Sequence, residues 1–155
     1  MNYRSDLEQF YGSIVNSSWF GIMNEYSTTN TTIGMGTLLP SYVDSSAPTG
    51  VVTGSQIEAR LSSLISSGAV PKPDKNTYYA IHMSPQVTNV TFDSGPSFCK
   101  DWCGYHYGIF DSSYAWPFIA YGVMPDPSIC KGRCGYPYLD GLTMASAHEI
   151  GRAHV

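Results

Sequence analysis

The stretch Thr77-Tyr78-Tyr79-Ala80-Ile81-His82-Met83 is the clearest β-strand in the sequence, because residues that favour strands fill it without a break. Apolar side chains occupy both of its alternating faces, whereas a strand with one face in water would alternate apolar and polar residues. Strands of this kind usually lie in the middle of a sheet that helices cover on both faces. The stretch therefore predicts a central strand flanked by helices.

Two helices are marked by capping boxes, in which a hydroxyl residue is followed three positions later by Glu or Gln. Ser5–Glu8 opens one, with apolar residues at helical spacing up to Val15, and Thr53–Gln56 opens another that Gly68 ends. The other expected elements are a short helix over 19–26, a hairpin or extended loop over 31–43, strands over 87–92, 105–110 and 115–123, and a last helix from about Leu142, after a turn at Asp140-Gly141. The expected fold class is α+β or mixed α/β in a single domain, with a central sheet flanked by helices.

The composition favours a secreted protein. The 155 residues are 43% hydrophobic and 13% charged, which suits one domain with a sizeable core. The net charge of −4, without any run of Lys or Arg, argues against nucleic acid or an anionic membrane surface as a partner. No apolar stretch is long enough to span a membrane. The abundance of Ser, Thr, Gly, Pro and Tyr is typical of extracellular proteins that contain β-structure; oligomeric state stays open.

The start of the chain carries no signal peptide, because no apolar run of the required length follows Met1. We expect that the natural start is missing and that the complete protein is extracellular. The sequons at Asn16, Asn30 and Asn89 are candidate glycosylation sites, with unused surface loops as the alternative.

Four cysteines form two Cys-x3-Cys pairs, Cys99/Cys103 and Cys130/Cys134. In an oxidising compartment they would form two disulfides in one of three connectivities. Four thiolates at this spacing could instead bind zinc. The composition favours disulfides, and the spacing leaves their connectivity open.

The segment Ala147-His148-Glu149-Ile150 is similar to the first turn of a zinc-binding catalytic helix. In His-Glu-x-x-His the two histidines bind zinc and the Glu is the general base, which makes His148 a candidate metal ligand and Glu149 a candidate catalytic residue. The second histidine would fall at Arg152, which cannot bind a metal, so the motif is unfinished. His106, just after a cysteine pair, is a further possible site residue, whereas His82 reads as a core histidine.

The last six residues, Ile150–Val155, can be encoded by an adapter oligonucleotide used in DNA sequencing. We therefore expect residues 1–149 to form a partial domain and residues 150–155 to be a non-native read-through tail.

Four motifs occur in one order: Phe98–Tyr107 with Cys-x3-Cys-Gly-Tyr-His-Tyr, Tyr114-Ala115-Trp116, Cys130–Tyr138 with Cys-x3-Cys-Gly-Tyr-Pro-Tyr, and Asp140-Gly141 followed by Ala147–Ile150. Together they resemble segments of the EXORDIUM, or phosphate-induced protein 1, family, and they cover Cys99–Glu149 most strongly. The resemblance implies a secreted protein associated with cell-wall or other extracellular components. It also implies a zincin-like architecture, because the family helix continues as His-Glu-Ile-Ala-Glu.

Two functions follow from this resemblance. The first is a secreted extracellular or wall-associated protein whose molecular activity is unproven. The alternative is a zinc-dependent, metallopeptidase-like hydrolase whose active-site helix is truncated in this chain. No cofactor is certain, and zinc is a possible cofactor of the full-length protein only.

Overall fold

The computed structural model describes residues 3–29, 32–91, 98–130, 134 and 138–152. Helices and β-sheets are combined in it, which confirms the predicted α+β class. The chain forms two compact units, one from the residues up to Ser41 and one from the residues from Tyr42 onward. Each unit is described by itself.

The first unit contains helices α1 (Arg4–Ile14) and α2 (Ser18–Ile22) and the 3-10 helix η1 (Met23–Tyr26). The predicted capping box at Ser5 is wrong, because α1 begins one residue earlier, with Tyr3 at the cap position. Glu8 instead accepts a hydrogen bond of 2.8 Å from Nε of Arg4, one helical turn away, so its carboxylate does not reach back to the helix start. Ser17 caps α2 by accepting a hydrogen bond from the backbone N–H of Phe20.

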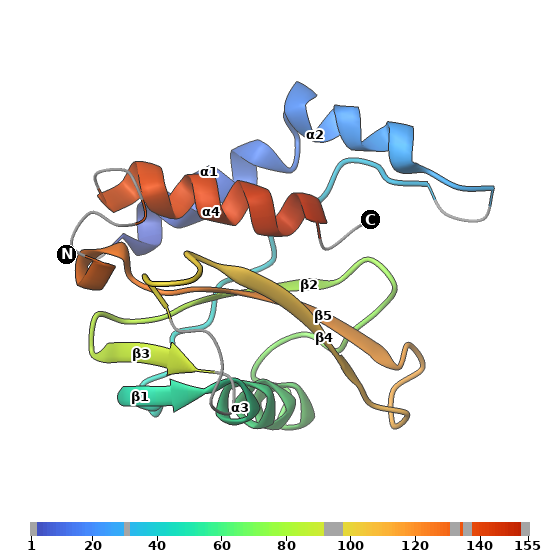
Figure 1. Cartoon of the computed structure of the whole chain (residues 1–155). Helices are drawn as coiled ribbons and strands as arrows, with labels where there is room; N and C mark the ends of the chain where they lie inside the picture. The colour runs from blue at the N-terminus through green and yellow to red at the C-terminus, as the bar shows by residue number, and fades with distance from the viewer. Residues whose placement is uncertain (1–2, 30–31, 92–97, 131–133, 135–137, 153–155) are drawn as a thin grey trace. The chain divides into compact units, whose positions relative to one another are not determined.

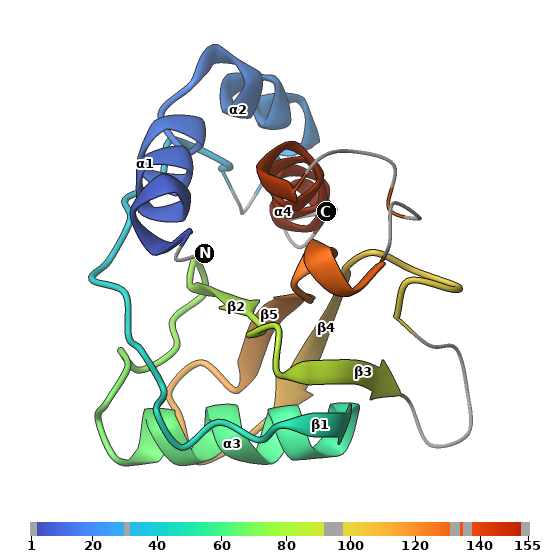
Figure 2. The same ribbon diagram turned by 90° about the vertical axis from the view of Figure 1, so that its left-hand side faces the viewer.

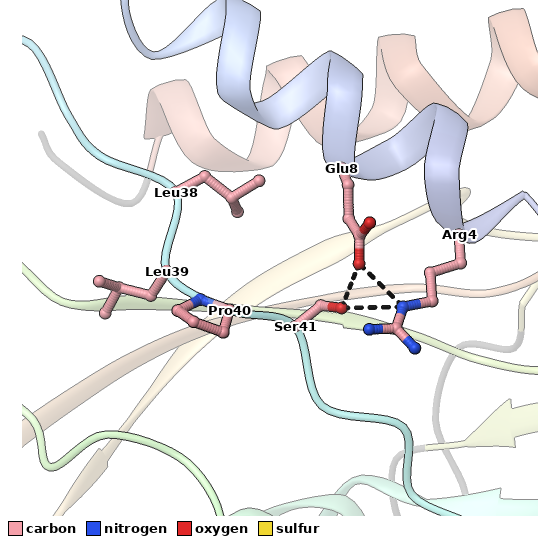
Figure 3. A pocket seen from close by; sticks show the side chains of 6 residues that line it. All are labelled: Arg4, Glu8, Leu38, Leu39, Pro40 and Ser41. Atoms are coloured by element: carbon pink, nitrogen blue, oxygen red, sulfur yellow. Dashed lines mark hydrogen bonds and ion pairs between the residues drawn. The ribbon is translucent and has the colours of Figure 1, made fainter.

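The extended segment after η1 returns to the helices. The N–H of Gly36 donates to the carbonyl oxygen of Val15, and a Cβ at Gly36 would lie 3.1 Å from Cβ of Val15, so glycine permits the close approach. At the end of the segment, Ser41 hydrogen-bonds with both Arg4 and Glu8 beside an open pocket of about 390 Å³ (Figure 3). These contacts lower the pKa of Glu8, with the hydrogen bond from Ser41 as the largest cause. Of the two predicted alternatives, a hairpin or an extended loop, the structure shows the loop, because residues 32–41 contain no strand.

The second unit is built on a three-stranded sheet of β2 (Tyr78–His82), β5 (Phe118–Met124) and β4 (Tyr105–Phe110), in that order. β5 pairs in parallel with β2 and antiparallel with β4. The expected strand at 77–83 is therefore present, but its predicted central position is wrong: β5 is the middle strand.

Helices lie on both sides of the sheet at β2, where Tyr79 is buried, Tyr78, Ile81 and His82 are half-buried and Ala80 is exposed. Tyr79 of β2 is buried in the core beside helix α3 (Gly54–Ser66), whereas Tyr78 points to the opposite face, toward helix α4 (Tyr138–Arg152). Figures 1 and 2 show α4 over one face of the sheet and α3 across the other. The burial of a strand's two faces does not depend on how many neighbouring strands it pairs with. Burial leaves an apolar pattern in the sequence, whereas strand pairing leaves none.

Below the main sheet, β1 (Gly50–Thr53) and β3 (Val87–Thr91) form a parallel pair. The sequence analysis found β3 but missed β1, a strand of four residues that leads directly into α3. The predicted capping box of α3 is confirmed: Thr53 accepts from the N–H of Gln56, and the Gln56 side chain accepts from the N–H of Thr53. Gly68 follows the helix with φ of 75°, a left-handed conformation that favours glycine.

Helix α4 begins at Tyr138, four residues before the expected start at Leu142. The predicted turn at Asp140-Gly141 is wrong, because both residues lie inside the helix. Asp140 is in the first turn, where its negative charge is favourable for the helix dipole. The short 3-10 helix η2 (Pro127–Cys130) follows β5 and contacts α4.

Candidate functional site

Helix α4 places Glu149 between itself and the sheet. Leu142, Ser146, Glu149 and Ile150 are buried, and their spacing puts them on one face of the helix. The hydroxyl of Ser146 donates 2.7 Å to the carbonyl oxygen of Leu142, so this buried polar group is satisfied within the helix. Glu149 instead reaches across to β4.

Two glycines make room for the Glu149 side chain. A Cβ at Gly104 would lie 3.2 Å from Oε1 and 3.3 Å from Cγ of Glu149, and a Cβ at Gly122 would lie 3.4 Å from Cβ of Glu149. The added atom at Gly122 would also collide with the hydroxyl of Tyr78, which lies over this position. The strand surface is therefore bare backbone where the carboxylate and the phenol approach it.

His106 on β4 is the direct partner of Glu149. Its Nδ1 lies 2.6 Å from Oε2 of the carboxylate, and strand pairing sets His106 opposite Gly122. The side chain of Glu149 is 6% exposed and that of His106 is 37% exposed. With an ionised carboxylate, Nδ1 must be the donor, which directs the basic character of a neutral imidazole to Nε2. Two separately predicted site residues, 43 positions apart, are thus brought together.

This arrangement has the elements of acid–base chemistry. A buried carboxylate that accepts Nδ1–H fixes the orientation and the tautomer of the imidazole. The partly exposed ring of His106 can then exchange protons with a molecule at the surface of β4. The contact with Nδ1 places Glu149 where it can orient His106. The catalytic role of Glu149 stays a prediction.

His82 lies on the same face of the sheet, paired with Met124 of β5. Burial lowers its pKa from 6.5 to about 4, so the ring is neutral at neutral pH. The prediction of a core histidine agrees with this environment. On the opposite face, burial raises the pKa of Tyr79 to about 12 and also raises those of Tyr105 and Tyr121, which keeps these phenols protonated.

The described residues do not by themselves complete a zinc site centred on His148. His148 is exposed on α4, whereas the neighbouring Glu149 is buried against His106. Within the described ranges, no group of three His, Asp or Glu side chains lies close enough to hold an ion. A zinc centre at His148 stays a prediction that requires ligands from outside the described residues.

The four cysteines form two disulfides, Cys99–Cys130 and Cys103–Cys134. Each bridge joins one Cys-x3-Cys pair to the other, so neither pair closes on itself. This confirms disulfide bonding and selects one of the three connectivities that the sequence left open. Both bridges span 31 positions and hold the start of β4 beside η2.

The candidate glycosylation sites differ in environment. Asn16 is exposed, and its side-chain amide donates to the carbonyl oxygen of Gly12. Asn89 is half-buried within β3, opposite Val51, and Asn30 lies outside the described residues. Glycosylation at all three remains a prediction.

Sequence reasoning missed Tyr78, Gly104 and Gly122 as members of the site. Glycine inside a strand often marks the close approach of another group, so Gly122 within 118–124 was a usable signal. Nothing local identified which group approaches, because Glu149 comes from a different element.

Comparisons with protein-family models, with curated proteins and with solved structures gave no match for this chain. None of the helices in the described part of the chain combines the length and the apolar character needed to cross a lipid bilayer.

Proposed function

We propose that this chain is a secreted, EXORDIUM-like protein that acts outside the cell in association with wall material. The observation that carries the proposal is the pair of disulfides. They connect Cys99–Cys103 with Cys130–Cys134, the two segments on which most of the resemblance rests. Structural disulfides persist in oxidising compartments and are rare in the cytosol.

A surface suited to a neutral polymer supports the same proposal. Phe110 and Phe118 are paired on one face of the β4–β5 hairpin and are 74% and 48% exposed, with Trp116 exposed nearby. Residues 104–126 contain no Lys or Arg, so the hairpin carries no permanent positive charge for an anionic partner. Exposed aromatic clusters of this kind mark interaction surfaces. We assign this one, the hairpin aromatic surface of Phe110, Trp116 and Phe118, to neutral polysaccharide.

The test has two parts. The full chain is produced behind a cleavable signal peptide, and free thiols are counted under denaturing conditions; we expect none. The purified protein is then mixed with isolated cell-wall material and sedimented. Phe110→Ser should reduce the sedimented fraction, whereas Met144→Ser, which alters an exposed apolar residue of α4, should not. Free thiols in the secreted protein, or wild-type protein left entirely in the supernatant, would contradict the proposal.

A second candidate function, hydrolysis, is favoured by the contact between His106 and Glu149. In this candidate His106 is the catalytic acid–base and Glu149 positions it, and the described residues need no metal for that role. A zinc-dependent form would depend on His148 and on ligands outside the described residues.

The two forms can be separated with ester and peptide substrates that release a fluorophore. For the acid–base form, His106→Gln should abolish turnover, and Glu149→Gln should lower kcat and shift its pH profile, while His148→Gln has little effect. For the zinc form, His148→Gln should abolish turnover and a chelator should inhibit the wild type. Equal rates for all variants and for buffer would exclude both.

A further inference from the structure

The two disulfides form one compact sulfur cluster. Sγ of Cys134 lies 3.3 Å from Sγ of Cys130, although these two atoms belong to different disulfides. The sulfurs of Cys99, Cys130 and Cys134 all lie within 4.8 Å of one another, and Cys103 is bonded to Cys134. Three sulfur atoms are therefore gathered at one point of the fold, and the fourth, that of Cys103, is attached to them through its bond to Cys134.

Backbone contacts hold the cysteines independently of the disulfides. The N–H of Cys99 donates 2.9 Å to the carbonyl oxygen of Trp102, and the N–H of Phe98 donates 3.3 Å to that of Val90. Cys99 adopts φ of 65°, a left-handed conformation that is unusual for any residue except glycine. The tight loop over 98–103 thus points both of its cysteines toward the same place.

The second cysteine pair is anchored by η2. Its first turn is closed by a hydrogen bond from the N–H of Ser128 to Oδ1 of Asp126, at 2.8 Å, and by one from the N–H of Ile129 to the Asp126 carbonyl oxygen. Cys130 at the end of η2 is 3% exposed. Phe98 is buried in the same cluster, and Trp102 and Ile129 pack against it, whereas Cys99, Cys103 and Cys134 are half-buried.

We infer that reduction converts this cluster into a binding site for a thiophilic divalent cation, with Zn²⁺ as the physiological candidate. Tetrahedral zinc with Zn–S distances of about 2.3 Å separates neighbouring sulfurs by about 3.8 Å. The sulfurs of Cys130 and Cys134, at 3.3 Å, are close to that separation, and the sulfur of Cys99 lies within 4.8 Å of both. The two sulfurs of a disulfide are about 2.05 Å apart, so each needs to move by only about 1 Å to reach the separation found in a zinc site. This inference concerns the reduced chain and is independent of the proposed function.

The chemistry is balanced by a dithiol reductant. Each protein disulfide takes two electrons and two protons from one dithiol molecule, which becomes a cyclic disulfide, so two dithiol molecules are consumed. Four protein thiols result. Zn²⁺ then displaces the four thiol protons to solvent and is held by four thiolates.

The test uses the full chain and Co²⁺, whose thiolate complexes have charge-transfer absorption that histidine and carboxylate complexes lack. Co²⁺ is added before the dithiol, so that ligation can replace the disulfides as they open. We expect one Co²⁺ per chain, a thiolate charge-transfer band, and displacement by Zn²⁺. The near-ultraviolet circular dichroism of the fold should be retained with metal and weakened without it.

Variants separate a built site from nonspecific thiol binding. Cys99→Ser and Cys134→Ser should each weaken Co²⁺ binding and lower the intensity of the charge-transfer band, because one of the four thiolates is lost. Ser128→Ala changes an exposed side chain two positions from Cys130, removes no sulfur and should bind like the wild type. The inference is overturned if the reduced chain shows no charge-transfer band, or if the cysteine variants bind Co²⁺ as tightly as the wild type with a band of the same intensity.

Discussion

The two faces of the β2-β5-β4 sheet are closed in different ways. Toward α3, the strand β5 presents Ile119, Tyr121 and Val123, all fully buried in the apolar core. Toward α4, it presents Gly122, and the space above this residue is filled by Tyr78 and Glu149. Alternate residues of one strand thus build an apolar core on one side and a polar site on the other.

The two faces of the sheet therefore have different roles: the α3 face stabilises this unit, and the α4 face holds its polar site. Apolar burial is non-directional and contributes roughly 25 cal/mol per Å² removed from water, so the α3 face needs only volume and shape. The α4 face holds a carboxylate and two histidines, each of which must be hydrogen-bonded or neutral to be buried. We therefore expect the α3 face to dominate the free energy of unfolding and the α4 face to dominate its pH dependence.

The largest effect is expected from the apolar face. Ile119→Ala should lower the free energy of unfolding by about 2–5 kcal/mol, because it leaves a cavity beside the central strand. Ile119→Val should cost about 0.5–1.5 kcal/mol, and Val51→Ala, at a 63% exposed position of β1, should cost almost nothing. Chemical denaturation measures all three. Equal losses for Ile119→Ala and Val51→Ala would show that the α3 face is not the core.

The next effect is a pH dependence from the α4 face. The folded pKa of His82 is about 4, below its ordinary value of 6.5, so the unfolded chain binds this proton more readily between those pH values. Stability should therefore fall as pH drops from 6.5 to 4, by at most about 3 kcal/mol from this residue. In His82→Gln, the free energy of unfolding measured by denaturant titration should differ less between the two pH values. If this difference is the same as in the wild type, another group causes the pH dependence.

A smaller loss is expected where the polar face approaches the backbone. Gly122→Ala should destabilise the chain by about 1–3 kcal/mol, because the new Cβ collides with the hydroxyl of Tyr78. Tyr78→Phe should recover part of that loss when combined with Gly122→Ala, since it removes the oxygen that collides. The recovery is partial because the added Cβ also lies 2.9 Å from Cζ of Tyr78. Strictly additive losses in the double-mutant cycle would show that the two residues do not interact.

The smallest effect concerns the hydrogen bond between Tyr121 and Glu58, a polar contact on the apolar face. The hydroxyl of Tyr121 donates 2.8 Å to Oε1 of Glu58 on α3, and Tyr121→Phe should cost about 1 kcal/mol. Tyr107→Phe, at a 64% exposed position of the adjacent strand, is the matched control and should cost nothing measurable. If the two variants unfold at the same denaturant concentration, the contact with Glu58 contributes no net stability.

Much of the fold could be predicted because its signals are local. The capping box at Thr53 and the glycine at position 68 bracket α3 within one segment, and the structure confirms both ends. The strands at 87–91 and 105–110 likewise follow from residues that favour extended chain over five or six positions. The error at Ser5 has a local cause too, since Glu8 can pair with Arg4 instead of the helix start.

The candidate site was predicted as separate residues and not as a site. His106 and Glu149 were each selected from neighbouring motifs, yet their contact depends on α4 crossing β4 and β5. The same limit explains why β2 was placed in the middle of the sheet. Its composition reports burial on two faces and carries no information about which strands pair at its edges.

The sequence by itself determined the α+β class, most element positions and the presence of paired cysteines. These properties depend on periodicity, capping and composition, which act within a few residues. Only the tertiary structure decided the strand order, the disulfide connectivity and the meeting of His106 with Glu149. Each joins segments far apart in the chain, and the free energy that selects such contacts comes from packing whole elements together rather than from any local preference.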